Sequence, residues 1–133
     1  AASATFALTS ARIAGLAAPA TLAPNSPYTL TVITENYIQR VYDVSVAWGY
    51  VAAPGFPQSL GRDVGSSYLG PDKSNILTNI SIETTAPAGL REAANAEGKV
   101  LLSAAVYSLY GALAQPTVAN FNVTVQVGDQ TST

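Results

Sequence analysis

"VYDVSVAWGY", residues 41–50, alternates between two sets of side chains with a period of two. One set is mostly aromatic or aliphatic and consists of Tyr42, Val44, Val46, Trp48 and Tyr50. The other set is small or polar and consists of Asp43, Ser45, Ala47 and Gly49. Because successive side chains of a β-strand point to opposite faces, this stretch predicts a strand whose aromatic face packs into a core.

The same period recurs along the chain, whereas no helical period of any length does. Further strands are predicted at 12–18, 28–36, 75–84, 99–110 and 118–128. Glycine and proline mark residues 51–67, 85–98 and 111–116 as loops, with one helical turn expected within 90–96. About seven strands at this spacing predict an all-β fold, a single immunoglobulin-like or fibronectin-III-like antiparallel β-sandwich.

Composition narrows the classes of function. The chain has 133 residues, 48% of them hydrophobic and 11% charged, with a net charge of −2. Its six cationic residues are scattered singly, so we expect no nucleic-acid partner. The apolar runs are too short for a transmembrane helix, so we expect no membrane insertion.

Catalytic chemistry is poorly represented. Histidine and cysteine are absent, which removes Ser-His-Asp triads, cysteine nucleophiles and typical zinc or copper sites. A carboxylate pair for glycoside hydrolysis is the remaining enzymatic reading, but the eight acidic residues show no pairing pattern. A calcium site from Asp63, Asp72 and Asn75 lacks a loop spacing, and turn chemistry explains Asp72 better. We therefore expect no enzyme activity, no catalytic residues, no metal and no cofactor.

Two glycosylation sequons indicate secretion. They are Asn79-Ile80-Ser81 and Asn122-Val123-Thr124, and the alternation places both asparagines on outward faces of their strands. The start, "AASATFALTSA", is small and apolar, as the remnant of a secretory signal or a disordered segment would be. The predicted division is residues 1–11 for that segment, 12–129 for the sandwich and 130–133 for a C-terminal tail.

The tyrosines suggest a binding surface. Tyr42, Trp48 and Tyr50 share the expected core face, whereas four other tyrosines lie near strand ends or on the opposite face. Tyrosine is favoured at protein interfaces, so these four and the adjoining "ENYIQR" and "GPDKSN" form a possible patch. The partner-binding candidates are Asn36, Tyr37, Ile38, Gln39, Arg40, Tyr68, Leu69, Asp72, Lys73, Tyr107 and Tyr110.

Four segments occur in a recognisable order: "TENYIQRVYDVSVAWG" (34–49), "YLGPDKSNILTNI" (68–80), "SLYGA" (108–112) and "PTVANFNVTVQVGD" (116–129). In them the chain resembles the necrosis-inducing secreted protein family of filamentous fungi, from about Arg12 to Asp129. The resemblance implies a secreted, non-enzymatic effector that suppresses plant pattern-triggered immunity by binding host receptor-associated kinases. It also implies that some members provoke plant cell death, and that the mature domain begins at Arg12.

Three alternatives stay open at this point. A fold role competes for the motif residues, since Gly70-Pro71-Asp72 can make a turn and Asn36 can bond to backbone. A carbohydrate-binding module on cell-wall polysaccharide is the second reading, which a flat row of exposed aromatics would favour, whereas buried Trp48 and Tyr50 would favour the effector. The working compartment is the apoplast or, if a cytoplasmic kinase is bound, the host cytoplasm. The sequence carries no uptake motif and does not define an oligomeric state.

Overall fold

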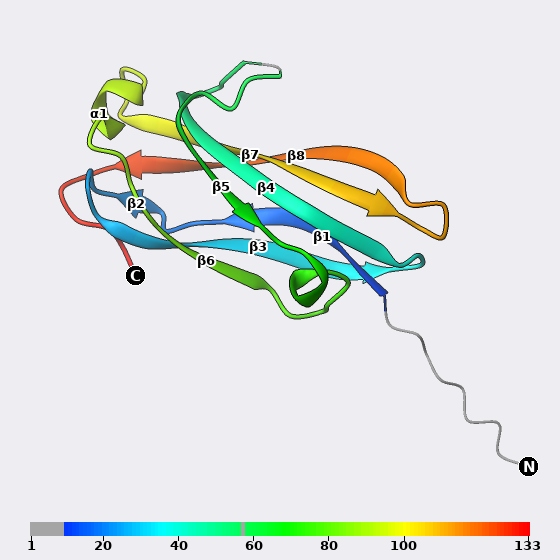
Figure 1. Cartoon of the computed structure of the whole chain (residues 1–133). Coiled ribbons are helices and arrows are strands. Elements are labelled where there is room, and N and C mark those ends of the chain that lie inside the picture. Colours follow the sequence, from blue (N-terminus) through cyan, green and yellow to red (C-terminus); the bar gives the residue numbers. More distant parts are fainter. Residues whose placement is uncertain (1–9, 57) are drawn as a thin grey trace, which may run out of the picture.

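The computed structural model describes residues 10–56 and 58–133, and it confirms the all-β sandwich (Figure 1). One sheet has the strand order β1-β3-β6 and the other has the order β2-β8-β7-β4-β5. All neighbouring strands are antiparallel except the short β2, which runs parallel to the end of β8. The elements are β1 (Ser10–Ala17), β2 (Thr21–Leu22), β3 (Pro27–Tyr37), β4 (Val41–Ala52), β5 (Arg62–Tyr68), the 3₁₀ turn η1 (Pro71–Lys73), β6 (Ile80–Thr85), α1 (Leu90–Ala93), β7 (Lys99–Tyr110) and β8 (Gln115–Val127).

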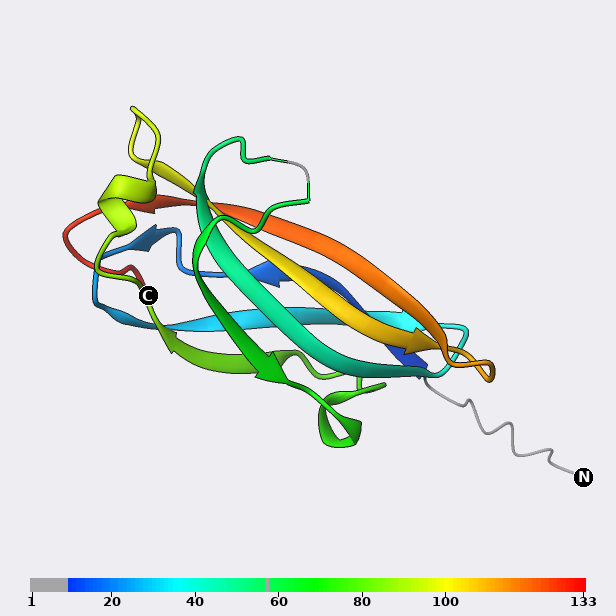
Figure 2. The same cartoon turned by 45° about the horizontal axis from the view of Figure 1, so that its top comes forward.

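The core lies between the two sheets, which Figure 2 shows as two layers. Alternate residues of the central strands fill it, as the period of two requires. The largest fully buried side chains are Tyr50, Leu22, Leu30, Leu90 and Leu102. Trp48 is also buried, and the expected helical turn is present as α1. No helix in the described part of the chain has the length and apolarity needed to cross a bilayer.

A β-bulge in β4 corrects one prediction. The pairing of β4 with β7 shifts register between Asp43 and Ser45. A bulge adds one residue to a strand and so reverses the facing of the side chains beyond it. As a result Tyr42, predicted in the core, is exposed, whereas Asp43, predicted outside, is buried. Val46, Trp48 and Tyr50 lie in the core as expected.

Two further differences from the prediction are a strand that was missed and a strand that begins later than expected. The predicted loop 51–67 contains most of β5, an edge strand whose side chains are mostly exposed and therefore show no apolar alternation. Gly65 in β5 pairs with Trp48, and a Cβ there would lie 2.6 Å from the indole ring, so glycine leaves room for it. The predicted strand 75–84 begins only at Ile80, which places Asn79 just before β6. Asn79 and Asn122 are both exposed.

The sandwich extends beyond the predicted bounds, residues 12–129, at both ends. β1 begins at Ser10 and buries Ala11, both within the segment predicted as 1–11, while residues 1–9 lie outside the described residues. In the predicted tail 130–133, the hydroxyl of Thr131 accepts a hydrogen bond from the Ala23 N–H at 3.1 Å. The Ser132 hydroxyl likewise accepts from the Thr21 N–H at 3.0 Å. This segment therefore lies along β2.

A buried pair of hydroxyl groups joins the two sheets. The phenol oxygens of Tyr28 on β3 and Tyr50 on β4 are 2.5 Å apart, and both residues are buried. Burial raises the pKa of both phenols, so both stay protonated and one donates to the other. Cysteine is absent, so this hydrogen bond and the surrounding core hold the sheets together without a disulfide.

Removing both phenol oxygens is expected to destabilise the fold much less than the two single removals added together. Tyr28→Phe or Tyr50→Phe leaves the other hydroxyl without this partner and should lower the free energy of unfolding by about 1–3 kcal/mol. The double variant should lose much less than the sum of the two. Urea unfolding followed by the fluorescence of the single tryptophan, Trp48, measures this. Additive losses in the double variant would contradict the pairing.

Candidate partner-binding surface

The segment 68–75, "YLGPDKSN", is held against the beginning of β4 by backbone and side-chain hydrogen bonds. The N–H groups of Leu69 and Gly70 donate to the carbonyls of Val44 and Asp43, each at 2.9 Å. The Ser74 hydroxyl accepts from the Asp43 N–H at 2.7 Å and lies 2.6 Å from the Gly70 carbonyl, to which it donates. These contacts fix the path of the chain from one sheet to the other.

Asn75 completes this anchor. Its side-chain oxygen accepts hydrogen bonds from the N–H of Ala11 at 3.1 Å and from the N–H of Val41 at 3.3 Å. One side chain therefore satisfies backbone donors at the ends of strands in both sheets. Gly70, at φ 75°, takes a backbone conformation that favours glycine.

The motif thus divides into core and surface residues. Leu69 is buried in the core, so it is not available at the surface described here, although the sequence made it a binding candidate. Tyr68, Asp72 and Lys73 are exposed. The fold role expected for Gly70 is seen directly, and Ser74 and Asn75 share it.

Asp43 is the buried acid beneath this segment. It is only 2% exposed, and its carboxylate accepts a hydrogen bond from the Ser108 hydroxyl at 2.6 Å. Burial raises the pKa of Asp43, and the hydrogen bond from Ser108 opposes that rise. The charged form is therefore held in the core at a cost.

Two neighbouring turns form one end of the sandwich, here called the turn end: residues 38–40 between β3 and β4, and 111–114 between β7 and β8. The Gly111 N–H donates to the Arg40 carbonyl at 2.8 Å, which joins the turns. Ile38 and Leu113 are each 93% exposed at these turns. Exposed apolar side chains indicate an interaction site when they form one patch, and the hydrogen bond between the turns places these two at the same end of the sandwich.

Aromatic contacts support the turn end from below. The rings of Tyr37 and Tyr110 meet edge to face, with centroids 5.5 Å apart. The Arg12 guanidinium lies 4.5 Å from the centre of the Tyr37 ring and forms an ion pair with Glu35 at 2.7 Å. The rings next to the turns are therefore held in place by contacts with each other and with Arg12.

A row of exposed side chains crosses the outer face of the five-stranded sheet. Residues directly opposite one another in antiparallel strands share a face, and Ser45 of β4 is opposite both Tyr68 of β5 and Tyr107 of β7. Tyr107 is in turn opposite Val118 of β8. This tyrosine row also includes Tyr42, whose hydroxyl is 3.0 Å from that of Tyr68. The hydrogen bond raises the pKa of Tyr42.

A groove of about 440 Å³ lies farther along the sheet, where residues 54–56 and 58–60 lie beside β7 and β8. Its lining is mixed, with Phe56 and Leu101 beside Ser103, Asn120 and the sequon residue Asn122. Within the described ranges no three acidic side chains gather as a metal site would need.

The structure gathers most of the predicted candidates in two places. The turn end holds or adjoins Asn36, Tyr37, Ile38, Gln39, Arg40 and Tyr110, and the tyrosine row holds Tyr68 and Tyr107. Asp72 and Lys73 lie on η1, next to Tyr68 in the chain. Sequence reasoning missed Leu113, Tyr42 and Val118. An apolar residue inside the turn "GALA" was the available signal for Leu113, and the bulge hid Tyr42.

Comparisons with known proteins agree on one group. The model of the Nis1 family matches residues 9–126. Necrosis-inducing secreted protein 1 of Colletotrichum higginsianum (strain IMI 349063) is 46% identical over 128 residues, which cover 96% of this chain and 85% of that protein. The protein of the same name from Colletotrichum orbiculare (strain 104-T) is 44% identical over 127 residues, covering 95% and 75%.

A solved structure also resembles the fold. The superoxide reductase (neelaredoxin) from Ignicoccus hospitalis aligns with a TM-score of 0.51 and 11% sequence identity, covering 90% of this chain and 82% of that chain. At this identity the likeness concerns the fold alone.

Asn75→Ala should destabilise the protein through its two backbone donors. Leaving the N–H groups of Ala11 and Val41 without this acceptor is expected to cost about 1–3 kcal/mol each where water cannot replace it. Asp72→Ala, on the exposed side of the same segment, is the matched control and should change stability by less than about 0.5 kcal/mol. Equal effects of the two in chemical unfolding would contradict the division of the motif.

Asp43 should make the protein more stable in mild acid. Its pKa is raised in the folded state, so between the unfolded value of about 4 and the raised value the folded protein binds more protons. The free energy of unfolding therefore falls as pH rises through this window. Asp43→Asn keeps an acceptor for Ser108 but cannot ionise, and its unfolding free energy should lack this fall. Parallel pH profiles of the two proteins would contradict the assignment.

Proposed function

Because this chain belongs to the Nis1 family, two relatives of which are named necrosis-inducing secreted proteins of Colletotrichum fungi, we propose that it suppresses plant pattern-triggered immunity by binding host receptor-associated kinases. The family predicted from the sequence is thereby confirmed. These relatives support a coarser statement, that the chain is a secreted fungal protein related to inducers of cell death. Kinase binding, suppression of immunity and entry into the host cytoplasm are the proposal.

The turn end is the observation that carries a binding function. Ile38 and Leu113 are almost fully exposed, and the edge-to-face pair of Tyr37 and Tyr110 lies next to them in the structure. Binding energy at protein interfaces concentrates in a few apolar and aromatic side chains that become buried. A partner with an apolar cleft would bury both aliphatic side chains while leaving the sandwich unchanged.

Polar groups around the turn end supply a rim. Gln39 and Arg40 lie exposed in the β3–β4 turn beside Ile38. Exposed polar side chains around an apolar centre are the usual arrangement of a protein interface. A positive charge at Arg40 suits a partner surface that is acidic near its apolar cleft.

Carbohydrate binding is the second candidate function, and the tyrosine row favours it. Tyr68 is 65% exposed, and Tyr42 and Tyr107 lie exposed on the same sheet face. Aromatic faces can stack on sugar rings, and the neighbouring groove offers amide and hydroxyl groups. Trp48 and Tyr50 are buried, however, which removes two of the largest rings from any such platform.

Kinase capture with turn-end variants tests the proposal. The purified protein is passed over cytoplasmic kinase domains of plant immune receptors, with insoluble chitin, glucan and cellulose in parallel. Ile38→Asp with Leu113→Asp should weaken kinase binding at least about tenfold, because two apolar contacts would become buried charges. Retained sugar binding without kinase binding would instead support the second candidate.

Val64→Asp is the matched control. Val64 is an exposed aliphatic residue of β5, two residues from Arg62, which pairs with Tyr50 near the far end of β4. This variant should bind kinase as the unchanged protein does. If it weakens binding as much as the turn-end pair does, the surface has been placed wrongly, and if no kinase is bound the proposed function is overturned.

A further inference from the structure

Most of β8 lies at an open sheet edge. Its partner on one side is β7, paired from Lys99–Gln126 to Tyr110–Gln115 without a register shift. On the other side β2 pairs only with Gln126 and Val127. Within residues 10–56 and 58–133 no other strand pairs with β8, so residues 115–125 have no hydrogen-bonded strand on that side, although β1 of the other sheet lies close to β8.

The direction of the backbone groups shows where the open hydrogen-bonding positions are. The N–H of Gln126 donates to the Ala20 carbonyl, and that of Gly128 donates to Leu22, so both point away from β7. Because backbone groups alternate sides along a strand, Val118, Asn120, Asn122 and Thr124 direct theirs to the same open edge. Pro116 has the same parity, where its missing N–H costs no ladder bond.

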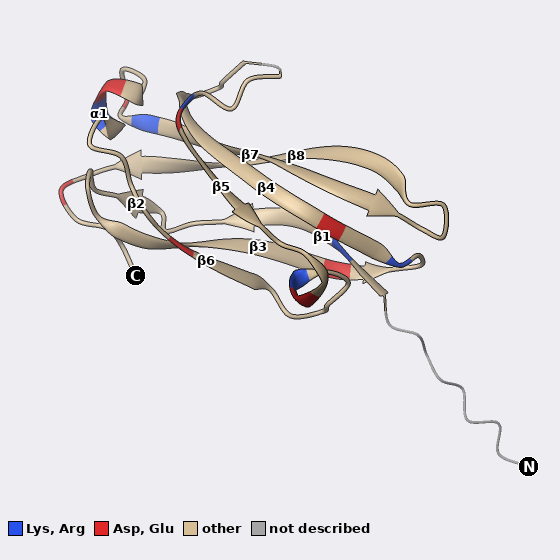
Figure 3. Ribbon diagram, in the orientation of Figure 1, with Lys and Arg blue, Asp and Glu red and all other residues tan. Residues whose placement is uncertain are grey.

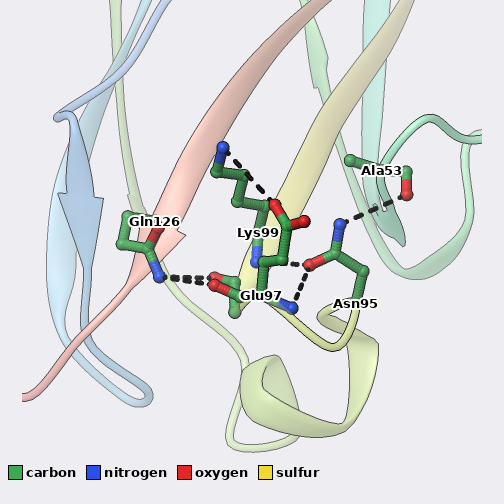
Figure 4. Close-up of polar contacts among 6 residues, drawn as sticks. Ala53, Asn95, Glu97, Lys99 and Gln126 are labelled. Carbon is green, nitrogen blue, oxygen red and sulfur yellow. Dashed lines mark hydrogen bonds and ion pairs between the residues drawn. The ribbon is translucent and has the colours of Figure 1, made fainter.

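β8 has few of the features that usually prevent an edge strand from pairing with another chain. Charged residues, bulges and prolines prevent strands from pairing with other chains. No charged residue occurs from Gln115 to Val127, as the entirely tan β8 in Figure 3 shows, and Pro116 protects only the beginning of the strand. The far end of the open edge is closed by β2. The Gln126 side chain lies on the β7 side instead, where it donates to the carbonyls of Glu97 and Gly98 (Figure 4).

Asn122 provides a different kind of protection. It is the acceptor of a sequon, it is exposed, and it sits at the third of the four edge-facing positions. We propose that the β8 edge is a pairing surface for a second copy of this chain, and that an N-linked glycan on Asn122 closes it. Secretion, which the relatives' names indicate, exposes the sequon to the glycosylation machinery.

The modification is an ordinary glycosyl transfer. The amide nitrogen of Asn122 forms a bond to the anomeric carbon of a lipid-pyrophosphate-linked oligosaccharide. The bond from that carbon to the phosphate oxygen breaks, the lipid pyrophosphate leaves with the electron pair, and one amide proton is lost to a base of the transferase. No oxidant or reductant is required.

A second copy fits the bare edge because the two edges are identical and uncharged. Antiparallel pairing about a two-fold axis brings one β8 beside the other without like-charge repulsion. It also places both outer faces on the same side, with directly opposite side chains only about 5 Å apart. When the two-fold axis passes beside Asn122, the two glycans begin within that distance, so we expect glycosylation to oppose pairing.

The experiment compares sequon variants secreted from a eukaryotic host. Asn122→Gln and Thr124→Ala both remove the sequon, whereas Thr124→Ser keeps it and is the matched control. Ser81→Ala removes the other sequon and controls for losing a glycan elsewhere. Intact mass gives the glycan on each protein, and light scattering after size exclusion gives the mass of the assembly as concentration rises.

Asn122→Gln and Thr124→Ala are expected to form dimers, and the unchanged protein, Thr124→Ser and Ser81→Ala to stay monomeric. Dimers should disappear when Val118→Lys is added to Asn122→Gln, because a charge then lies on each paired edge. Val64→Lys on β5, the opposite edge of the same sheet, should leave them intact.

Three outcomes would overturn the proposal. The unchanged protein carries no sugar on Asn122, the variants without that sugar stay monomeric at the highest attainable concentration, or Val64→Lys removes the dimer as Val118→Lys does. Far-UV circular dichroism and thermal unfolding of every variant separate loss of pairing from loss of fold. The kinase assay is independent of this result, so each proposal can fail alone.

Discussion

The β-bulge in β4 determines how the segment 68–75 and the tyrosine row are placed. One added residue between Asp43 and Ser45 turns Asp43 into the core and Tyr42 out of it. The buried carboxylate is held by Ser108 of β7, while the backbone of the same residue bonds to Gly70 and Ser74. One residue thereby connects the central strands to the segment that crosses between the sheets. The tyrosine row depends on that arrangement, because Tyr42 meets Tyr68 only on the outer face.

Burying an acid to build this connection has a thermodynamic cost that an apolar residue would avoid. The cost is limited because the carboxylate and the backbone around it are hydrogen-bonded, and no buried polar side-chain atom in the described residues lacks a partner. Polar networks of this kind favour one arrangement of neighbouring elements over others that would leave a donor unsatisfied. Here the selected arrangement is the path of residues 69–75.

Sequence reasoning predicted the parts of the fold that repeat and missed the parts that depend on a single local event. Strands β3, β4 and β8 were predicted because their side chains alternate, and β7 because its residues are apolar on both faces. β5 was missed because an edge strand with exposed faces carries no such pattern, and Tyr42 was misplaced because alternation cannot reveal an inserted residue. The turn end could be predicted only in part. "ENYIQR" marks one turn, but the proximity of Leu113 follows from the register of β4 and β7, which sequence alone does not give.

The contacts of Thr131 and Ser132 with β2 have a consequence for how the chain reaches its fold. They join residues separated by 108 and 111 positions in the sequence, and the pairings of β2 with β8 span similar distances. Loops of this length must close before such contacts stabilise anything, and proteins dominated by distant pairings fold slowly for that reason. Docking of β2 between β8 and this segment is therefore expected to be a late event.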